Sequence, residues 1–166
     1  MIAKPIELSF EGVRVNLPSQ KTYDQLLSSL LDDLGHSPVD LDELERSHGS
    51  WESYRGQAES LAGPSGFMLF ALVDHGAWMA KVGSFSRSIR VVLGNPALAI
   101  TMLQHDINAG LFAPVEMLLV EEAGNSRLMY VKPSSLMVVE PNAELEVAAQ
   151  HLDEKLLALA VKVTSA

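Results

Sequence analysis

The sequence contains no cysteine among its 166 residues. This absence excludes disulfide bonds, thiolate nucleophiles and cysteine-ligated metal sites. Basic residues are also scarce, with 12 lysines and arginines against 21 acidic residues and a formal net charge of -9. A field of this sign repels the phosphate backbone of nucleic acids, so we expect no nucleic-acid partner.

Long apolar runs are missing as well, and no stretch is long enough to cross a bilayer. The first residues lack the apolar segment of a signal peptide, and Glu7 and Glu11 follow soon after. We therefore expect a soluble, cytoplasmic protein without a membrane partner. A chain of this length forms one domain, residues 1–166, which buries about 70% of its unfolded surface without a disulfide or a metal.

The recognisable motifs of catalysis and cofactor binding are absent too. The sequence has no phosphate-binding Walker loop, no dinucleotide glycine motif and no histidine pair at helical metal-ligand spacing. We expect no cofactor and no metal, because the five histidines lie far apart in the chain: His36, His48, His75, His105 and His151.

Two alternating apolar runs open the chain. Ile6–Glu11 and Val13–Leu17 both have the two-residue period of half-buried strands. Thr22 then begins a helix with a capping-box pattern completed by Gln25, and Gly35 ends it.

Residues 36–65 are acidic, rich in serine and glycine, and poor in aliphatic side chains. We interpret this stretch as a polar insertion with short helices that begin near Asp40 and Ser50. Trp51 and Tyr54 share one face of the second helix. They are candidates for a partner interface, since aromatic residues are enriched there, or they attach the insertion to the domain.

The remaining pattern predicts four strands, at residues 66–73, 88–93, 115–122 and 127–131. One helix follows Gly94-Asn95-Pro96 and closes at Gly110, and the last helix spans residues 142–164. Its apolar positions recur at alternating spacings of four and three. This seam packs either on the sheet or on a second copy, and its candidate interface residues are Leu152, Leu156 and Leu159.

Two places offer chemistry. Asp74-His75, at the end of a strand, pairs a carboxylate with an imidazole that could act as a general base, although neighbouring strand residues point to opposite faces. Asn95 begins a helix directly after a strand, where free N–H groups and the helix dipole can bind an anion. Simple capping also explains the residues at both places.

The landmarks from Gly66 to Leu136 resemble a bacterial family, the domain of unknown function 302 (DUF302). They include the strand ending in Asp74-His75, the sequence Leu93-Gly94-Asn95-Pro96, and Pro114, Leu118, Glu121, Tyr130 and Pro133. The resemblance leaves out the insertion and the last helix. It implies an α+β fold, a two-layer sandwich of a mostly antiparallel sheet with helices on one face. It also implies a homodimer, and no established activity.

The chain departs from the family pattern at three places. Ala99-Ile100 stands where the family has Gly-Thr, Phe112 where it has aspartate, and Glu116 where it has a basic residue. These changes either alter a ligand site that the family shares or are structural and compensated nearby.

Two functions follow as predictions. The first is a non-catalytic binding or interaction protein that forms a homodimer. The alternative is a binder of a small anionic ligand, or an enzyme, with His75 near the helix N-terminus at Asn95 and with Asp74 and Tyr130 as further ligand-binding candidates. Regulation through the insertion, with Trp51 and Tyr54 meeting a partner, is a third possibility.

Overall fold

The computed structural model of the protein describes residues 4–46 and 49–166. Its centre is a single five-stranded sheet in the order β1-β5-β4-β3-β2, and every neighbouring pair is antiparallel. The strands are β1 (Arg14–Ser19), β2 (Met68–Asp74), β3 (Ser88–Gly94), β4 (Val115–Glu122) and β5 (Asn125–Val131).

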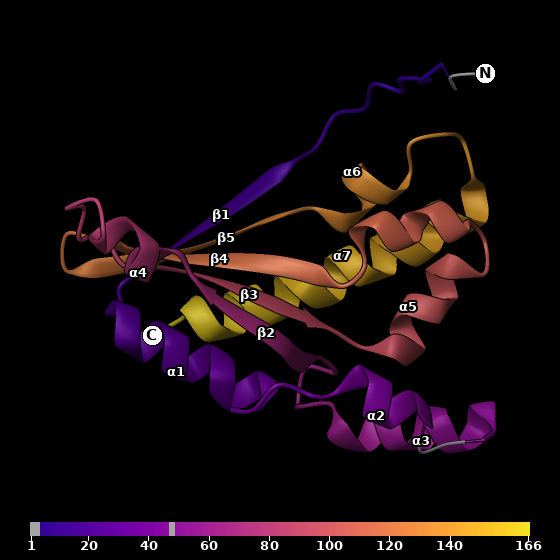
Figure 1. Ribbon diagram of the computed structural model, residues 1–166, viewed down its shortest axis with the longest axis horizontal. Helices are drawn as coiled ribbons and strands as arrows, with labels where there is room; N and C mark the ends of the chain where they lie inside the picture. The colour runs from indigo at the N-terminus through magenta and orange to yellow at the C-terminus, as the bar shows by residue number, and fades with distance from the viewer. Residues whose placement is uncertain (1–3, 47–48) are drawn as a thin grey trace.

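Two helices, α1 (Tyr23–Leu34) and α7 (Ala143–Thr164), pack against one face of the sheet (Figure 1). The predicted α+β architecture with helices against an antiparallel sheet is therefore confirmed. The shorter helices lie around the ends of the strands: α2 (Leu41–Arg46), α3 (Trp51–Leu61), α4 (His75–Ala80), α5 (Pro96–Leu103), the 3-10 helix η1 (Ile107–Phe112) and α6 (Pro133–Met137).

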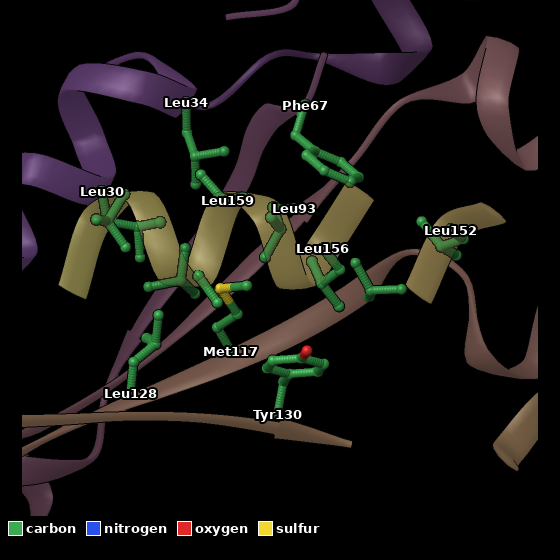
Figure 2. Close-up of a cluster of buried hydrophobic side chains, with 14 of the residues drawn as sticks. Leu30, Leu34, Phe67, Leu93, Met117, Leu128, Tyr130, Leu152, Leu156 and Leu159 are labelled. Atoms are coloured by element: carbon green, nitrogen blue, oxygen red, sulfur yellow. The ribbon is translucent and has the colours of Figure 1, made fainter. Parts of the chain in front are cut away.

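The main core lies between α1, α7 and the sheet (Figure 2). Leu30 of α1, Met117 of β4 and Leu128 of β5 are each at most 1% exposed. The predicted capping box of α1 is present, because the Thr22 hydroxyl accepts from the Gln25 N–H while the Gln25 side chain accepts from the Thr22 N–H. This cap fixes where α1 begins and so which of its faces meets the sheet.

The apolar seam of α7 is used entirely inside the protein. Leu152, Leu156 and Leu159 are at most 3% exposed and belong to the main core. The prediction that they form an interface with a second copy is therefore wrong. The stripe faces the sheet, the surface on which one amphipathic helix buries most apolar area.

Residues 36–65 form two short helices, as predicted. Asp40 accepts a hydrogen bond from the Glu43 N–H at the start of α2, and Ser50 caps α3 by accepting from the Ser53 N–H. The two helices share a small second core with β2, whose buried members are Leu44, Ala58 and Met68.

Two predicted elements change. The strand predicted at residues 6–11 does not form, because no other strand pairs with it; residues 4–13 run as an extended arm that leaves the body beyond β1 (Figure 1). The helix predicted to reach Gly110 ends at Leu103. The 3-10 helix η1 follows as a separate element, because the Asp106 carboxylate accepts a hydrogen bond from the Asn108 N–H and so caps a new helix.

Candidate functional site

An apolar cavity of about 210 Å³ lies at the junction between β3 and α5. Its walls come from separate parts of the chain: the insertion, β2, the β3–α5 junction, the loop before β4, and α7. The lining residues are Leu41, Tyr54, Phe67, Phe70, Gly94, Asn95, Pro96, Leu98, Ala99, Met102, Leu103, Ala113, Pro114, Val115 and Leu152.

The junction itself is shaped by three consecutive residues. A Cβ on Gly94 would lie 2.8 Å from the Phe70 ring and 3.4 Å from Pro114, so only glycine lets these two walls approach. Asn95 is the N-cap of α5 and Pro96 takes its first position, where a missing N–H costs no hydrogen bond.

Both ends of the Asn95 amide have structural partners. Its oxygen accepts from the Ala97 N–H at 2.9 Å, and its nitrogen donates to the Gly66 carbonyl at 2.9 Å. The side chain therefore ties α5 to the loop that enters β2. The backbone N–H groups of Leu98 and Ala99 bond to the Asn95 carbonyl.

This bonding closes the predicted anion cradle. Within the first turn of α5, Pro96 has no N–H, and the N–H groups of Ala97, Leu98 and Ala99 all have partners within the protein. An anion at this helix end would have to displace one of these bonds, in surroundings that are mostly apolar. The geometry favours capping over anion binding.

Asp74 and His75 lie at the other end of the β2–β3 pair. Asp74 pairs with Ile89, whereas Met68 pairs with Gly94 next to Asn95. The five residue steps from Ile89 to Gly94 span about 17 Å of strand. His75 follows the last residue of β2, and Asn95 follows the last residue of β3. Because these two strands are antiparallel, their last residues lie at opposite ends of the strand pair. The predicted site that joins His75 to the α5 N-terminus therefore does not form.

The Asp74–His75 pair has a local structural role instead. The Asp74 carboxylate caps α4 by accepting from the Ala77 N–H at 2.9 Å. His75 occupies the first position of that helix, and its ring lies 5.0 Å from the ring of Trp78. The arrangement is that of a capped turn, the simpler of the two interpretations of this dipeptide.

Tyr130 also lies away from the cavity. It sits on the core face of β5, 5% exposed and packed in the main core (Figure 2). Burial raises the pKa of its hydroxyl, and the negative charge of Asp153 raises it further. It contributes to the core and is absent from the walls of this cavity, but it also borders a second groove, of about 440 Å³.

The two aromatic residues of α3 take different positions. Tyr54 is half-buried and lines the cavity, whereas Trp51 is 42% exposed and stacks beside it with ring centroids 6.0 Å apart. Desolvation raises the pKa of the Tyr54 hydroxyl, and Glu45 adds to the rise. The fold brings Tyr54, Asn95 and Leu152 to this cavity. It brings two other predicted residues, His75 and Tyr130, to the lining of the separate groove of about 440 Å³.

The sequence alone did not reveal the other walls. Ordinary core residues have the same types and spacing as Phe70, Ala99 and Met102. The sequence therefore does not distinguish residues that line a cavity from residues that fill a core. The only available signal was Ala99, a position at which the chain departs from the family pattern.

In the two segments that the structure describes, no group of three or more histidine, aspartate or glutamate side chains could hold a metal ion. Among the helices of those segments, none is both long and apolar enough to cross a bilayer.

Comparison with known proteins identifies a fold and a family. A crystal structure of an uncharacterized conserved protein DUF302 from Bacillus stearothermophilus matches with a TM-score of 0.65. The match covers 90% of this chain and 97% of that chain at 14% sequence identity, a level that shows a shared fold. No curated protein matches the chain.

The sequence profile of a family, described as "Domain of unknown function DUF302", matches residues 43–163. These residues include part of the insertion and nearly all of α7, both of which lie outside the resemblance seen in the sequence. Since the match spans well over half of the 166 residues, the chain belongs to the DUF302 family.

Proposed function

We propose that this protein is a non-catalytic binding protein whose cavity at the β3–α5 junction holds a small, uncharged and mostly apolar molecule. The observation that carries the proposal is the cavity of about 210 Å³, whose walls are mainly aliphatic and aromatic. An apolar cavity of about 150 Å³ is large enough to bind benzene, so this one accepts a substituted ring or a short branched chain.

Two polar groups border the cavity and would orient such a molecule. The Asn95 amide nitrogen carries two hydrogens, and one of them is used by the Gly66 carbonyl. The second can donate to a carbonyl or hydroxyl oxygen of the ligand. Tyr54 adds a hydroxyl whose raised pKa keeps it protonated at neutral pH. Few polar groups in an apolar pocket are typical of small-molecule sites.

The lining also favours binding over catalysis. The lining residues include no carboxylate, imidazole, amine or serine hydroxyl. General acid–base or nucleophilic chemistry needs such a group within hydrogen-bond reach of the substrate. His75, the only candidate base raised by the sequence, lies at the far end of β2.

Tryptophan fluorescence tests the proposal. Trp51 stacks on Tyr54, a wall of the cavity, so a bound molecule changes the surroundings of its indole. In a Trp78→Phe background Trp51 is the sole tryptophan. We expect a saturable emission change with toluene and none with hexanoate, whose carboxylate is costly to bury without a partner.

A cavity-filling variant shows whether the signal comes from this cavity. Ala99→Leu adds a larger side chain to its wall and should abolish the toluene response while raising stability by about 0.5–2 kcal/mol. Ala158→Leu, on the exposed face of α7, is the matched control and should leave the response unchanged. A toluene response that survives Ala99→Leu, or a missing response in the parent, would refute the proposal.

Self-association into a homodimer is the second candidate. It is supported by the sheet face opposite α1 and α7, where Leu118, Met129 and Val131 are all partly or fully exposed. A groove of about 440 Å³ crosses this face. Exposed apolar surface of this kind is common at subunit interfaces.

A further inference from the structure

The N-terminal arm, residues 4–13, has the pattern of a strand, but no strand within residues 4–46 and 49–166 pairs with it. Ile6, Leu8 and Phe10 alternate with polar residues and are 89%, 59% and 46% exposed. A row of exposed apolar side chains on an extended segment is the form in which a chain adds to another surface.

The base of the arm is fixed to the body. The Val13 N–H donates to the Ser135 hydroxyl at 2.9 Å, and the Val13 carbonyl accepts from the Lys132 N–H at 2.7 Å. Phe10 places its ring edge-on to Phe112 with centroids 5.7 Å apart. The base of the arm therefore touches the edge of its own groove, which Phe112 lines. The outer half of the arm runs away from the sheet (Figure 1) and leaves the rest of the groove open.

The groove of about 440 Å³ on the open sheet face, called the sheet-face groove below, complements the arm in its apolar surface and its charge. Its floor includes Leu118, Met129 and Val131, and its charged residues include Arg14, Arg90 and Glu116. Arg90 pairs with Glu116, which leaves the charge of Arg14 uncompensated within the groove. The groove is thus locally positive on a protein whose formal net charge is -9.

The arm carries the opposite charge, with more acidic than basic residues. Glu7 and Glu11 stand between its apolar residues, against one lysine, Lys4. An apolar row flanked by carboxylates therefore suits an apolar floor with an arginine at its edge.

We infer that two copies exchange N-terminal arms, each arm lying in the sheet-face groove of the partner. This inference rests on the proposed homodimer and adds the contact that holds it together. An exchange of identical elements about a two-fold axis makes the interface self-complementary and closes the assembly at two copies.

A charge-swap mixture tests the exchange. Glu7→Arg gives an arm and a groove that are both positive, and Arg14→Glu makes both negative, so each variant should be monomeric alone. Mixed in equal amounts, they should form a heterodimer, because each arm then meets a groove of opposite charge. An arm folded onto its own groove would give no heterodimer, and this outcome would overturn the inference.

Removal of the apolar row provides a second measurement. The double variant Ile6→Ser and Leu8→Ser should weaken the dimer by about 100-fold or more in light scattering, since four apolar side chains leave the interface. Val147→Ser with Leu157→Ser removes exposed apolar surface from α7 instead and should leave the dimer intact.

The outcomes separate the inference from the homodimer proposal. A parent chain that is monomeric at high micromolar concentration overturns both. A parent dimer that survives Ile6→Ser with Leu8→Ser overturns the arm exchange while the homodimer stands. A dimer lost only in the α7 control places the interface on α7 and likewise overturns the exchange.

Discussion

Replacement of Asn95 by alanine separates the structural role of this residue from a role in ligand binding. The side chain makes two hydrogen bonds, one to the Ala97 N–H as the N-cap of α5 and one to the Gly66 carbonyl. Loss of a good N-cap costs about 1 kcal/mol. Loss of a hydrogen bond that leaves a half-buried carbonyl without its partner costs about 1 kcal/mol more.

The expected loss for Asn95→Ala is therefore about 2 kcal/mol in the free energy of unfolding. For a domain of this size, each kcal/mol lowers the melting temperature by about 2–4 °C, which gives about 4–8 °C in total. Urea unfolding followed by circular dichroism measures the free energy directly, provided that the m-value stays constant.

Asn95→Asp divides the loss into its two parts. A carboxylate still accepts from the Ala97 N–H, but it cannot donate to the Gly66 carbonyl. We expect about half of the alanine effect. Asn108→Ala, at an exposed residue whose side chain caps no helix, should stay within about 0.5 kcal/mol of the parent. Equal stability of Asn95→Ala and the parent would refute the assignment of both hydrogen bonds.

Two further predictions concern stability. Gly63→Ala should cost about 2–3 kcal/mol in urea unfolding, because a Cβ at this position would overlap the carbonyl oxygen of Asp33. Gly56→Ala, with open space around its Cβ, should be neutral or stabilising. Equal effects of the two substitutions would contradict the close approach of Gly63 to Asp33. Asp24→Asn should remove a pH-dependent contribution to stability. The Arg87 hydrogen bond lowers the pKa of Asp24 from its ordinary value, so the contribution is present above the ordinary aspartate pKa and is lost as the pH falls through the folded-state pKa. Stability curves of parent and variant that stay parallel through the acid range would contradict it.

The helices were predictable where local signals decide them. Thr22 with Gln25, Ser50 and Asn142 all cap helices that begin where the pattern indicates. A cap is a bond between residues two or three apart, so its information is contained in a short stretch of sequence. The turn at Gly124, with φ 91°, is also decided locally, because glycine adopts this conformation without strain.

The arm shows the limit of periodic patterns. Ile6, Leu8 and Phe10 have the alternation of a strand, yet a strand forms only where another strand offers hydrogen bonds. The sequence of one chain does not state whether that partner lies in the same copy. The same limit explains Leu152, whose helical spacing suits packing on a sheet as well as on a second helix.

The cavity could not be predicted because it results from imperfect filling between distant segments. Tyr54 and Leu152 were both predicted to matter as interface residues, but the fold turns them toward the same internal space. Their separation of almost one hundred residues means that only the tertiary structure brings them together. Asp74 and His75 are the opposite case. They are adjacent in sequence and have side chains suited to catalysis, yet in the fold Asp74 only caps a helix.

Three of the four residues at which the resemblance implies a departure from the family pattern lie at the two places for which we propose binding. Ala99 lines the cavity, and Phe112 and Glu116 line the sheet-face groove. An aspartate in place of Phe112 would set a carboxylate against the ring of Phe10 and repel the acidic arm. A basic residue in place of Glu116 would repel Arg90 where the ion pair now forms. The apolar Phe112 contacts Phe10 at the base of the arm, and the Arg90–Glu116 pair leaves Arg14 as the positive group on which the proposed arm exchange depends.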